Sequence, residues 1–152
     1  MSYYILQNQK KASIKLGNIL SDAGATSKIF NLEGTNNFVF KEYKEKKLAL
    51  SSENKVDYFI NNPPDKSLKP IKLSNFEMHQ LAWPKQKVFD KKNNFAGFIM
   101  PKIRLDEAFT IEKLFSYKNR QKYNISEDIL WRITVCRNLA DLFFELHKNK
   151  YL

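Results

Sequence analysis

The stretch FVFKEY, residues 38–43, places a lysine at the centre of an apolar segment. Its aromatic and β-branched side chains favour a strand, and the turn-forming sequence GTNN precedes it at residues 34–37. A lysine on a buried strand face is costly unless a charge partner accompanies it. Lys41 is therefore the first candidate for a functional residue.

Two more strands are predicted before this one, at residues 14–20, where apolar and polar residues alternate, and at residues 28–32. A helix is predicted after it, at about residues 49–61. The pair Pro63-Pro64 ends this helix, because proline cannot donate the helical hydrogen bond. One side of the helix is predicted to contain Leu50, Val56, Phe59 and Ile60.

A second hairpin is predicted from residues 86–89 and 95–100, joined by the polar turn KKNN at residues 91–94. The resulting order is three strands, one helix and two strands, followed by helices. We therefore predict an α+β fold, in which a five-stranded antiparallel sheet with one inserted helix precedes C-terminal helices.

The last third of the chain is predicted to be helical. A short helix is expected from Thr110, a capping residue, with Glu112 in its first turn, and residues 126–128, SED, should cap a long helix. The apolar stripe at residues 129–146 is too wide for a free surface helix. We expect a partner surface to cover it: the rest of a larger domain, a partner protein or a second copy. Cys136, within the stripe, is predicted to be buried.

Composition restricts the class of protein. The formal net charge is +10, which suits an anionic partner, but the lysines are spread along the chain, so nucleic-acid binding is only an alternative. The single cysteine excludes an internal disulfide and a cysteine-based zinc site. No apolar run is long enough to span a bilayer. A cytoplasmic protein without a membrane or metal site of its own is expected.

Two further motifs suggest a family. They are LAWP at residues 81–84 and GFIMP at residues 97–101, with the segment NNPP at residues 61–64. Together with Lys41 in its strand, they resemble the divergent bacterial, eukaryotic-like Ser/Thr protein kinases. The resemblance implies an N-lobe with its hinge at residues 1–103 and the start of a helical C-lobe at residues 104–152. It also implies ATP with Mg as the ligand.

The resemblance implies a phosphate-binding loop at residues 21–30, in which Gly24 keeps a glycine identity and Ser27 takes the last glycine position. Asp22 takes the first, where it would repel phosphates unless a metal or a lysine intervenes. Ile29 would contact the adenine. Lys41 would bind the α- and β-phosphates and pair with Glu53, or with Glu45 if the helix begins earlier.

The resemblance also implies a hinge in which Met100 is the gatekeeper. Pro101 would then offer its carbonyl to the adenine amino group, and Ile103 would offer its amide. Proline lacks an amide donor but keeps its carbonyl, so Pro101 is compatible with adenine binding.

The catalytic motifs of kinases do not occur in these residues, which contain neither H-R-D nor D-F-G. We therefore expect a domain truncated before its catalytic loop, with metal ligands outside this chain and no phosphotransfer by the chain alone. A non-catalytic interaction module, or pseudokinase-like half-domain, and a basic nucleic-acid-binding protein are the alternatives.

Overall fold

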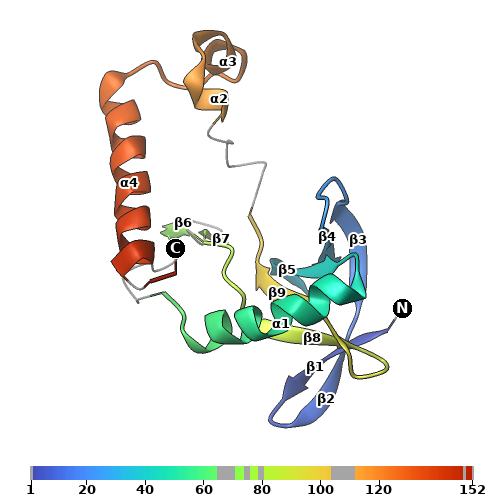
Figure 1. Cartoon of the computed structure of the whole chain (residues 1–152). Coiled ribbons are helices and arrows are strands. Elements are labelled where there is room, and N and C mark those ends of the chain that lie inside the picture. Colours follow the sequence, from blue (N-terminus) through green and yellow to red (C-terminus); the bar gives the residue numbers. More distant parts are fainter. Residues whose placement is uncertain are drawn as a thin grey trace. The chain divides into compact units, whose positions relative to one another are not determined.

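The computed structural model describes residues 2–64, 71–73, 76–78, 81–103, 112–148 and 150–151. The chain divides into two compact units (Figure 1). The first contains Met1–Pro63 and Pro70–Lys102, and the second contains Ile103–Leu152. Each unit is described below by itself.

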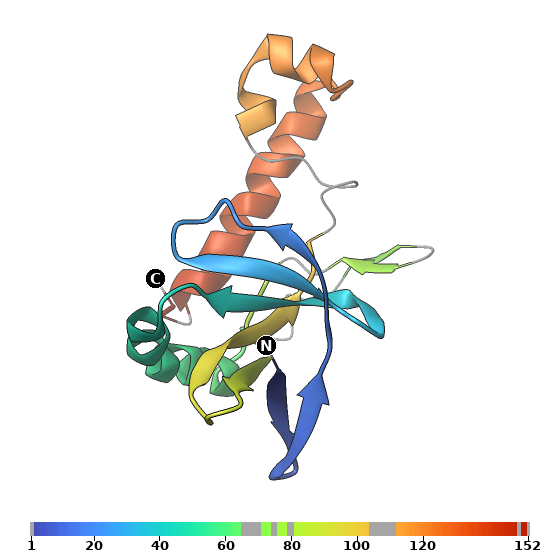
Figure 2. The same ribbon diagram turned by 90° about the vertical axis from the view of Figure 1, so that its right-hand side faces the viewer.

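The first unit is built on an antiparallel sheet of seven strands, which curls as it is followed from edge to edge (Figure 2). Its spatial order is β2-β1-β8-β9-β5-β4-β3. The strands are β1 (Tyr3–Gln7), β2 (Lys10–Ile14), β3 (Leu16–Ser21), β4 (Ser27–Leu32), β5 (Thr35–Tyr43), β8 (Gln86–Asp90) and β9 (Phe95–Pro101). A separate two-stranded hairpin consists of β6 (Ile71–Leu73) and β7 (Phe76–Met78).

The α+β class was predicted correctly, but the predicted five strands are wrong in number. The five are present as β3, β4, β5, β9 and β8, which are contiguous in the sheet. The hairpin β1–β2 was missed, and it pairs with β8 through Tyr3 and Tyr4. Its turn uses Asn8 and Gln9 at positive φ, with neither position occupied by the glycine that usually marks such a turn.

The side chains of β5 alternate between two hydrophobic cores. Phe40 faces a core that also contains Tyr3, Ile5, Leu32 and Val88. The next residues toward the opposite face, Val39 and Lys41, lie on the side of the sheet that α1 covers, because successive strand residues point to opposite faces. The face of β5 that contains Phe40 is thus opposite to the face that contains the candidate lysine.

Helix α1 (Lys46–Asn61) lies across β9 and buries Ala49 and Val56 against Phe95 and Phe98 (Figures 1 and 2). The helix ends just before Pro63, as predicted. The predicted position of Leu50 on the covered side is wrong, since its side chain is 61% exposed. Ala49 takes that place, with its side chain buried in the same cluster as Val56, Phe95 and Phe98.

The second unit contains α2 (Glu112–Phe115), α3 (Tyr117–Lys122) and α4 (Ile129–Lys148). Arg120 links them: its Nε donates to Glu127 at 3.0 Å and its Nη1 to the Leu114 carbonyl at 2.7 Å. The predicted acidic cap of α4 is present, since Asp128 Oδ1 accepts the Leu130 amide at 2.9 Å. The predicted cap at Thr110 lies outside the described residues.

Helix α4 contains no buried residue. The prediction that Cys136 is buried is therefore wrong: its thiol is exposed. The predicted apolar stripe of α4 is present, but no described element of the second unit covers it. Among the described helices, none is both long enough and apolar enough to cross a membrane.

Candidate functional site

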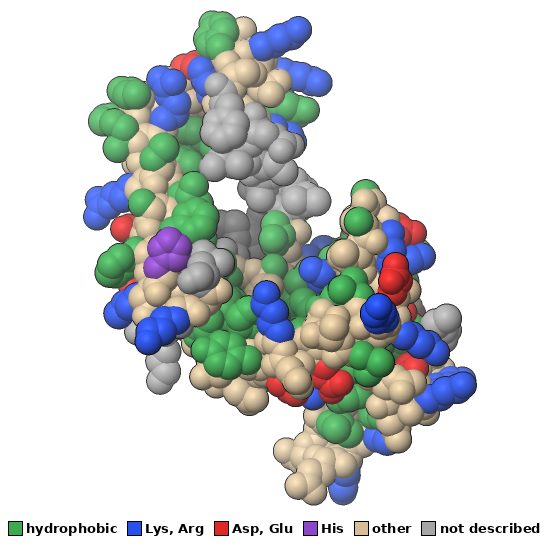
Figure 3. All heavy atoms as spheres, viewed as in Figure 1, with side chains coloured by type: hydrophobic (Ala, Val, Ile, Leu, Met, Phe, Trp, Pro, Cys, Tyr) green, Lys and Arg blue, Asp and Glu red, His purple; other side chains and the backbone are tan. Residues whose placement is uncertain are grey.

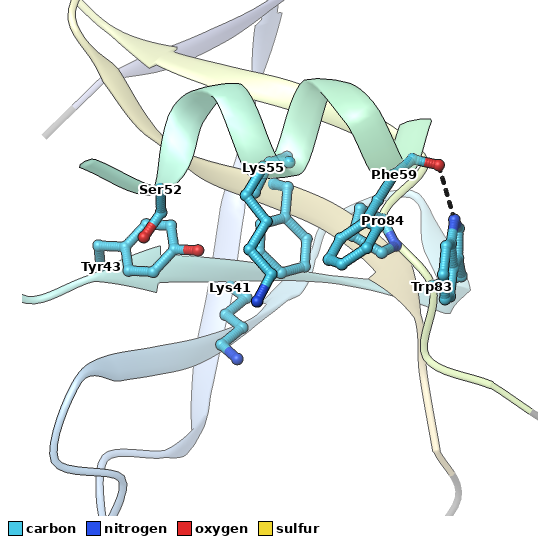
Figure 4. A pocket seen from close by; sticks show the side chains of 9 residues that line it. Lys41, Tyr43, Ser52, Lys55, Phe59, Trp83 and Pro84 are labelled. Carbon is cyan, nitrogen blue, oxygen red and sulfur yellow. Dashed lines mark hydrogen bonds between the residues drawn. The ribbon is translucent and has the colours of Figure 1, made fainter. Parts of the chain in front are cut away.

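A pocket of about 330 Å³ opens in the first unit between β5, β9 and α1 (Figure 4). Its polar groups come from Lys41 and Tyr43 on β5 and from Ser52 and Lys55 on α1. Its apolar walls are Val56, Phe59, Trp83, Pro84 and Phe98. Aromatic walls with a few convergent polar groups are typical of small-molecule sites.

Lys41 lies on β5, an interior strand of the sheet that pairs with β4 on one side and β9 on the other. It lies directly opposite Ile29 on β4 and Phe98 on β9, and its Nζ is 5.7 Å from the centroid of the Phe98 ring. On β9, Gly97 lets the two backbones approach closely: a Cβ atom at Gly97 would lie 2.0 Å from the Lys41 carbonyl oxygen. Only glycine at position 97 leaves room for the backbone of Lys41 at this distance.

The LAWP motif closes one end of the pocket. Trp83 Nε1 donates to the Phe59 carbonyl in the last turns of α1 at 2.8 Å, and the two rings lie 5.0 Å apart between centroids (Figure 4). This bond satisfies one of the carbonyls that the end of a helix leaves without a helical partner. Trp83 and Pro84 therefore anchor α1 and line the pocket at once.

Two lysines reach into the pocket from opposite elements, Lys41 from β5 and Lys55 from α1 (Figure 4). Lys55 Nζ lies 5.6 Å from the centroid of the Phe59 ring. Among the described residues, no carboxylate lines the pocket or lies within ion-pair distance of either lysine. The site therefore carries two positive charges beside aromatic walls.

The predicted ion pair between Lys41 and Glu53 is wrong. Glu53 instead pairs with Lys87 of β8 at 3.1 Å, and Asp57 pairs with the same amine at 2.8 Å. Burial lowers the pKa of Lys87, but the hydrogen bonds to Asp57 and Glu53 outweigh it and hold the pKa above its ordinary value. The alternative, Glu45, is the residue before α1 and is exposed.

The predicted phosphate loop lies between β3 and β4. Asp22 pairs with Lys28 at 3.1 Å and with Lys44 at 2.7 Å, so lysines do intervene beside this carboxylate. Hydrogen bonds from Lys44 and Lys28 hold the pKa of Asp22 below its ordinary value. Ser27, the first residue of β4, is buried, and a Cβ atom at Gly24 in the loop would lie 3.3 Å from the Ser27 carbonyl oxygen.

The other predicted residues divide between the two units. Ile29 and Met100 share the face of Lys41, since Met100 lies opposite Val39, two residues before the lysine. Pro101 is fully buried at the end of β9. Ile103 belongs to the second unit and is 55% exposed. The adenine contacts of Pro101 and Ile103 stay predictions.

Sequence reasoning missed Lys55, Ser52 and the structural role of Trp83. The first two follow from the orientation of α1: with Ala49 and Val56 against the sheet, Ser52 and Lys55 come to the side facing Lys41. The spacing of Ala49 and Val56, seven residues apart, was the available signal.

A second pocket, of about 550 Å³, is lined by Tyr3, Leu16, Asp22, Lys28, Phe30, Glu42 and Lys44. The described residues contain no group of three or more His, Cys, Asp or Glu side chains that could hold a metal ion.

Comparison of the chain with protein-family models, curated proteins and solved structures finds no match.

Proposed function

We propose that the first unit is the ATP-binding portion of a Ser/Thr protein-kinase-like domain, which binds nucleotide on the α1 side of its sheet. The support begins with the element order: β3, β4, β5, α1, β8 and β9 occur along the chain as three strands, a helix and two strands, with the separate hairpin β6–β7 between α1 and β8. This is the arrangement that the resemblance implies for an N-lobe.

The observation that carries the proposal is the position of Lys41. Its strand is central in the sheet, its neighbours across the ladder are Ile29 and Phe98, and it opens onto the aromatic-walled pocket. An apolar residue for the base and a lysine for the phosphates, on one face, are what an adenine nucleotide requires.

We propose binding without phosphotransfer by these residues alone. A kinase positions the attacking hydroxyl and its metal ions with the aspartates and the asparagine of its H-R-D and D-F-G motifs. Neither motif occurs in the 152 residues. Any Mg that accompanies ATP would take its kinase-type ligands from outside this chain.

A thermal-shift titration with millimolar ATP tests the proposal. A ligand at 100 times its dissociation constant stabilises a fold by about 2.7 kcal/mol, which raises the melting temperature by several degrees. We expect this rise in the wild type and in the control Lys10→Met, an exposed lysine of β2, and its loss in Lys41→Met. An unchanged melting temperature in the wild type would contradict the proposal.

A second candidate function, protein interaction, is favoured by α4. The helix exposes large side chains, among them Ile133 and Phe143, and contains no buried residue. Arg132 and Arg137 lie in its N-terminal half, whereas Asp141 and Glu145 lie in its C-terminal half with Lys148, and Arg137 also pairs with Asp141 of the same helix at 3.9 Å. An antiparallel copy of α4 would place arginines opposite carboxylates, so we infer a second copy of this chain as the partner.

Light scattering across a concentration series tests this candidate. A dimer is expected in the wild type and in the control Leu6→Glu, which changes an exposed leucine of β1. Phe143→Glu should give a monomer, because it places a charge in the apolar stripe. A wild-type monomer at high concentration would contradict self-association.

A nucleic-acid role has less support. It requires the lysines to converge on one surface beside exposed aromatic side chains. On the face shown in Figure 3, Lys and Arg side chains are dispersed over both units among acidic and hydrophobic ones. This distribution does not favour a nucleic-acid groove over a small anionic ligand.

A further inference from the structure

The side of α1 that faces Lys41 presents a lysine where the kinase resemblance implies a carboxylate. Lys55 and Ser52 line the pocket, whereas Glu53 does not. The pocket thus has two cationic side chains, the hydroxyl groups of Ser52 and Tyr43, and no acidic one among the described residues.

The orientation of α1 is held at several points, so Glu53 cannot replace Lys55 without a rotation of the helix. Val56 of α1 is buried against the sheet, and the Phe59 carbonyl accepts a hydrogen bond from the Trp83 indole N–H. On the neighbouring side of the helix, Lys87 holds Glu53 and Asp57 together. Bringing Glu53 to the place of Lys55 needs a rotation by two residues, about 200°, and even a rotation by one residue, about 100°, would break these contacts and expose Val56.

Two ammonium groups that line one pocket repel each other, although solvent screens part of this repulsion because Lys55 is exposed. An anion with several negative charges would relieve this repulsion. Lysine binds phosphate as a mobile point charge with three donors, and the Ser52 and Tyr43 hydroxyls can donate to further oxygens. Successive phosphates match two separate lysines better than a single carboxylate does.

We propose that Lys55 and Lys41 together bind the polyphosphate group of the ligand, and that they do so without a divalent metal ion. The inference rests on the proposed function in that the remainder of the ligand is a nucleoside. In a kinase the phosphate charge is neutralised largely by Mg; here Lys55 supplies the second positive charge from within the chain.

Isothermal titration calorimetry in EDTA tests the inference with adenosine, AMP, ADP, ATP and inorganic tripolyphosphate. We expect affinity to rise with each added phosphate and tripolyphosphate itself to bind. Lys55→Met should weaken ATP at least about tenfold, as the loss of a charge-assisted contact does. Lys55→Arg should retain most of the affinity. Lys47→Met, an exposed lysine of the same helix, is the matched control.

The outcomes separate this inference from the proposed function. Equal affinities for adenosine and ATP, or ATP binding only when Mg is added, would overturn the two-lysine site while nucleotide binding stands. The opposite outcome is also possible: tripolyphosphate binds, adenosine does not bind, and ATP binds no more tightly than tripolyphosphate. That result would overturn the nucleotide function while the two-lysine site stands. If Lys55→Met melts below the wild type, the Lys55→Arg and tripolyphosphate arms still decide.

Discussion

The two faces of β5 differ in whether their charged side chains have a partner. On one face, Lys41 shares a pocket with Lys55, and no described carboxylate pairs with either. On the other, Glu42 accepts a hydrogen bond from Tyr3, and the nearby Asp22 is paired with two lysines. Lys41 and Glu42 are adjacent in sequence but separated by the sheet, because strand residues alternate.

This difference shows that a net charge of +10 does not by itself locate a binding site. Lys28 and Lys44 both pair with the Asp22 carboxylate, and Lys44 also donates to the Asp22 carbonyl at 2.8 Å, which ties the loop to the end of β5. Their role is structural. Lysines that lack such a partner are the ones available to an anionic ligand.

The largest expected effect comes from Gly97, where β9 approaches the backbone of β5 closely. Gly97→Ala would place a methyl group 2.0 Å from the Lys41 carbonyl oxygen, so the strands must shift. Overpacking of this kind costs about 3 kcal/mol or more. Urea denaturation should show this loss, whereas Gly34→Ala, at a turn with open space and positive φ, should cost about 1 kcal/mol. Equal losses in the two variants would be inconsistent with the close approach.

A smaller effect is expected from Tyr3→Phe, which removes the hydrogen bond to Glu42 on the face away from α1. Loss of a bond to a charged group costs about 2 kcal/mol at neutral pH. The matched control is Tyr4→Phe, whose hydroxyl donates to Asn93 at an exposed position and should matter less.

Tyr3 should also make stability depend on alkaline pH. Burial first, and then the hydrogen bond to Glu42, raise the pKa of Tyr3 above its ordinary value of 10.0. Its stabilising contribution is therefore complete below pH 10 and declines as pH rises above that value. Urea midpoints should fall less steeply above this pH in Tyr3→Phe than in the wild type; parallel curves would argue against the shift.

The smallest effect is expected from Asp22→Asn, because its ion pairs are exposed to solvent and salt. The pairs lower the pKa of Asp22, so their contribution is present above the ordinary value of 3.8 and is lost as pH falls through the lowered value. We expect little change in stability and unchanged ATP affinity. A large loss of ATP affinity in Asp22→Asn would indicate that the ligand binds near Asp22 and not on the α1 face, which would contradict the proposal.

Much of the first unit could be predicted from local patterns. The strand around Lys41 and the hairpin over residues 91–94 follow from residue type and turn chemistry alone. The hairpin β1–β2 could not be predicted, because Asn8 and Gln9 adopt positive φ without the glycine that signals it.

The candidate site was harder to predict because it depends on the orientation of α1. Leu48, Ala49 and Leu50 are consecutive apolar residues, so the pattern does not decide which faces the sheet. Assigning Leu50 instead of Ala49 rotates the helix by about 100°, and that one-residue error brings Glu53 to the position that Ser52 occupies on the side facing Lys41. Only packing against β9 decides between them.

The central claim is that an adenine nucleotide binds on the α1 face, and an amide-resolved NMR titration with ATP tests it most directly. We predict the largest shifts at Ser52, Lys55 and Phe98, which line the two-lysine pocket, and little change at Asp22 and Lys44 on the paired side. The largest shifts at Asp22 and Lys44, or none at saturating ATP, would contradict the account.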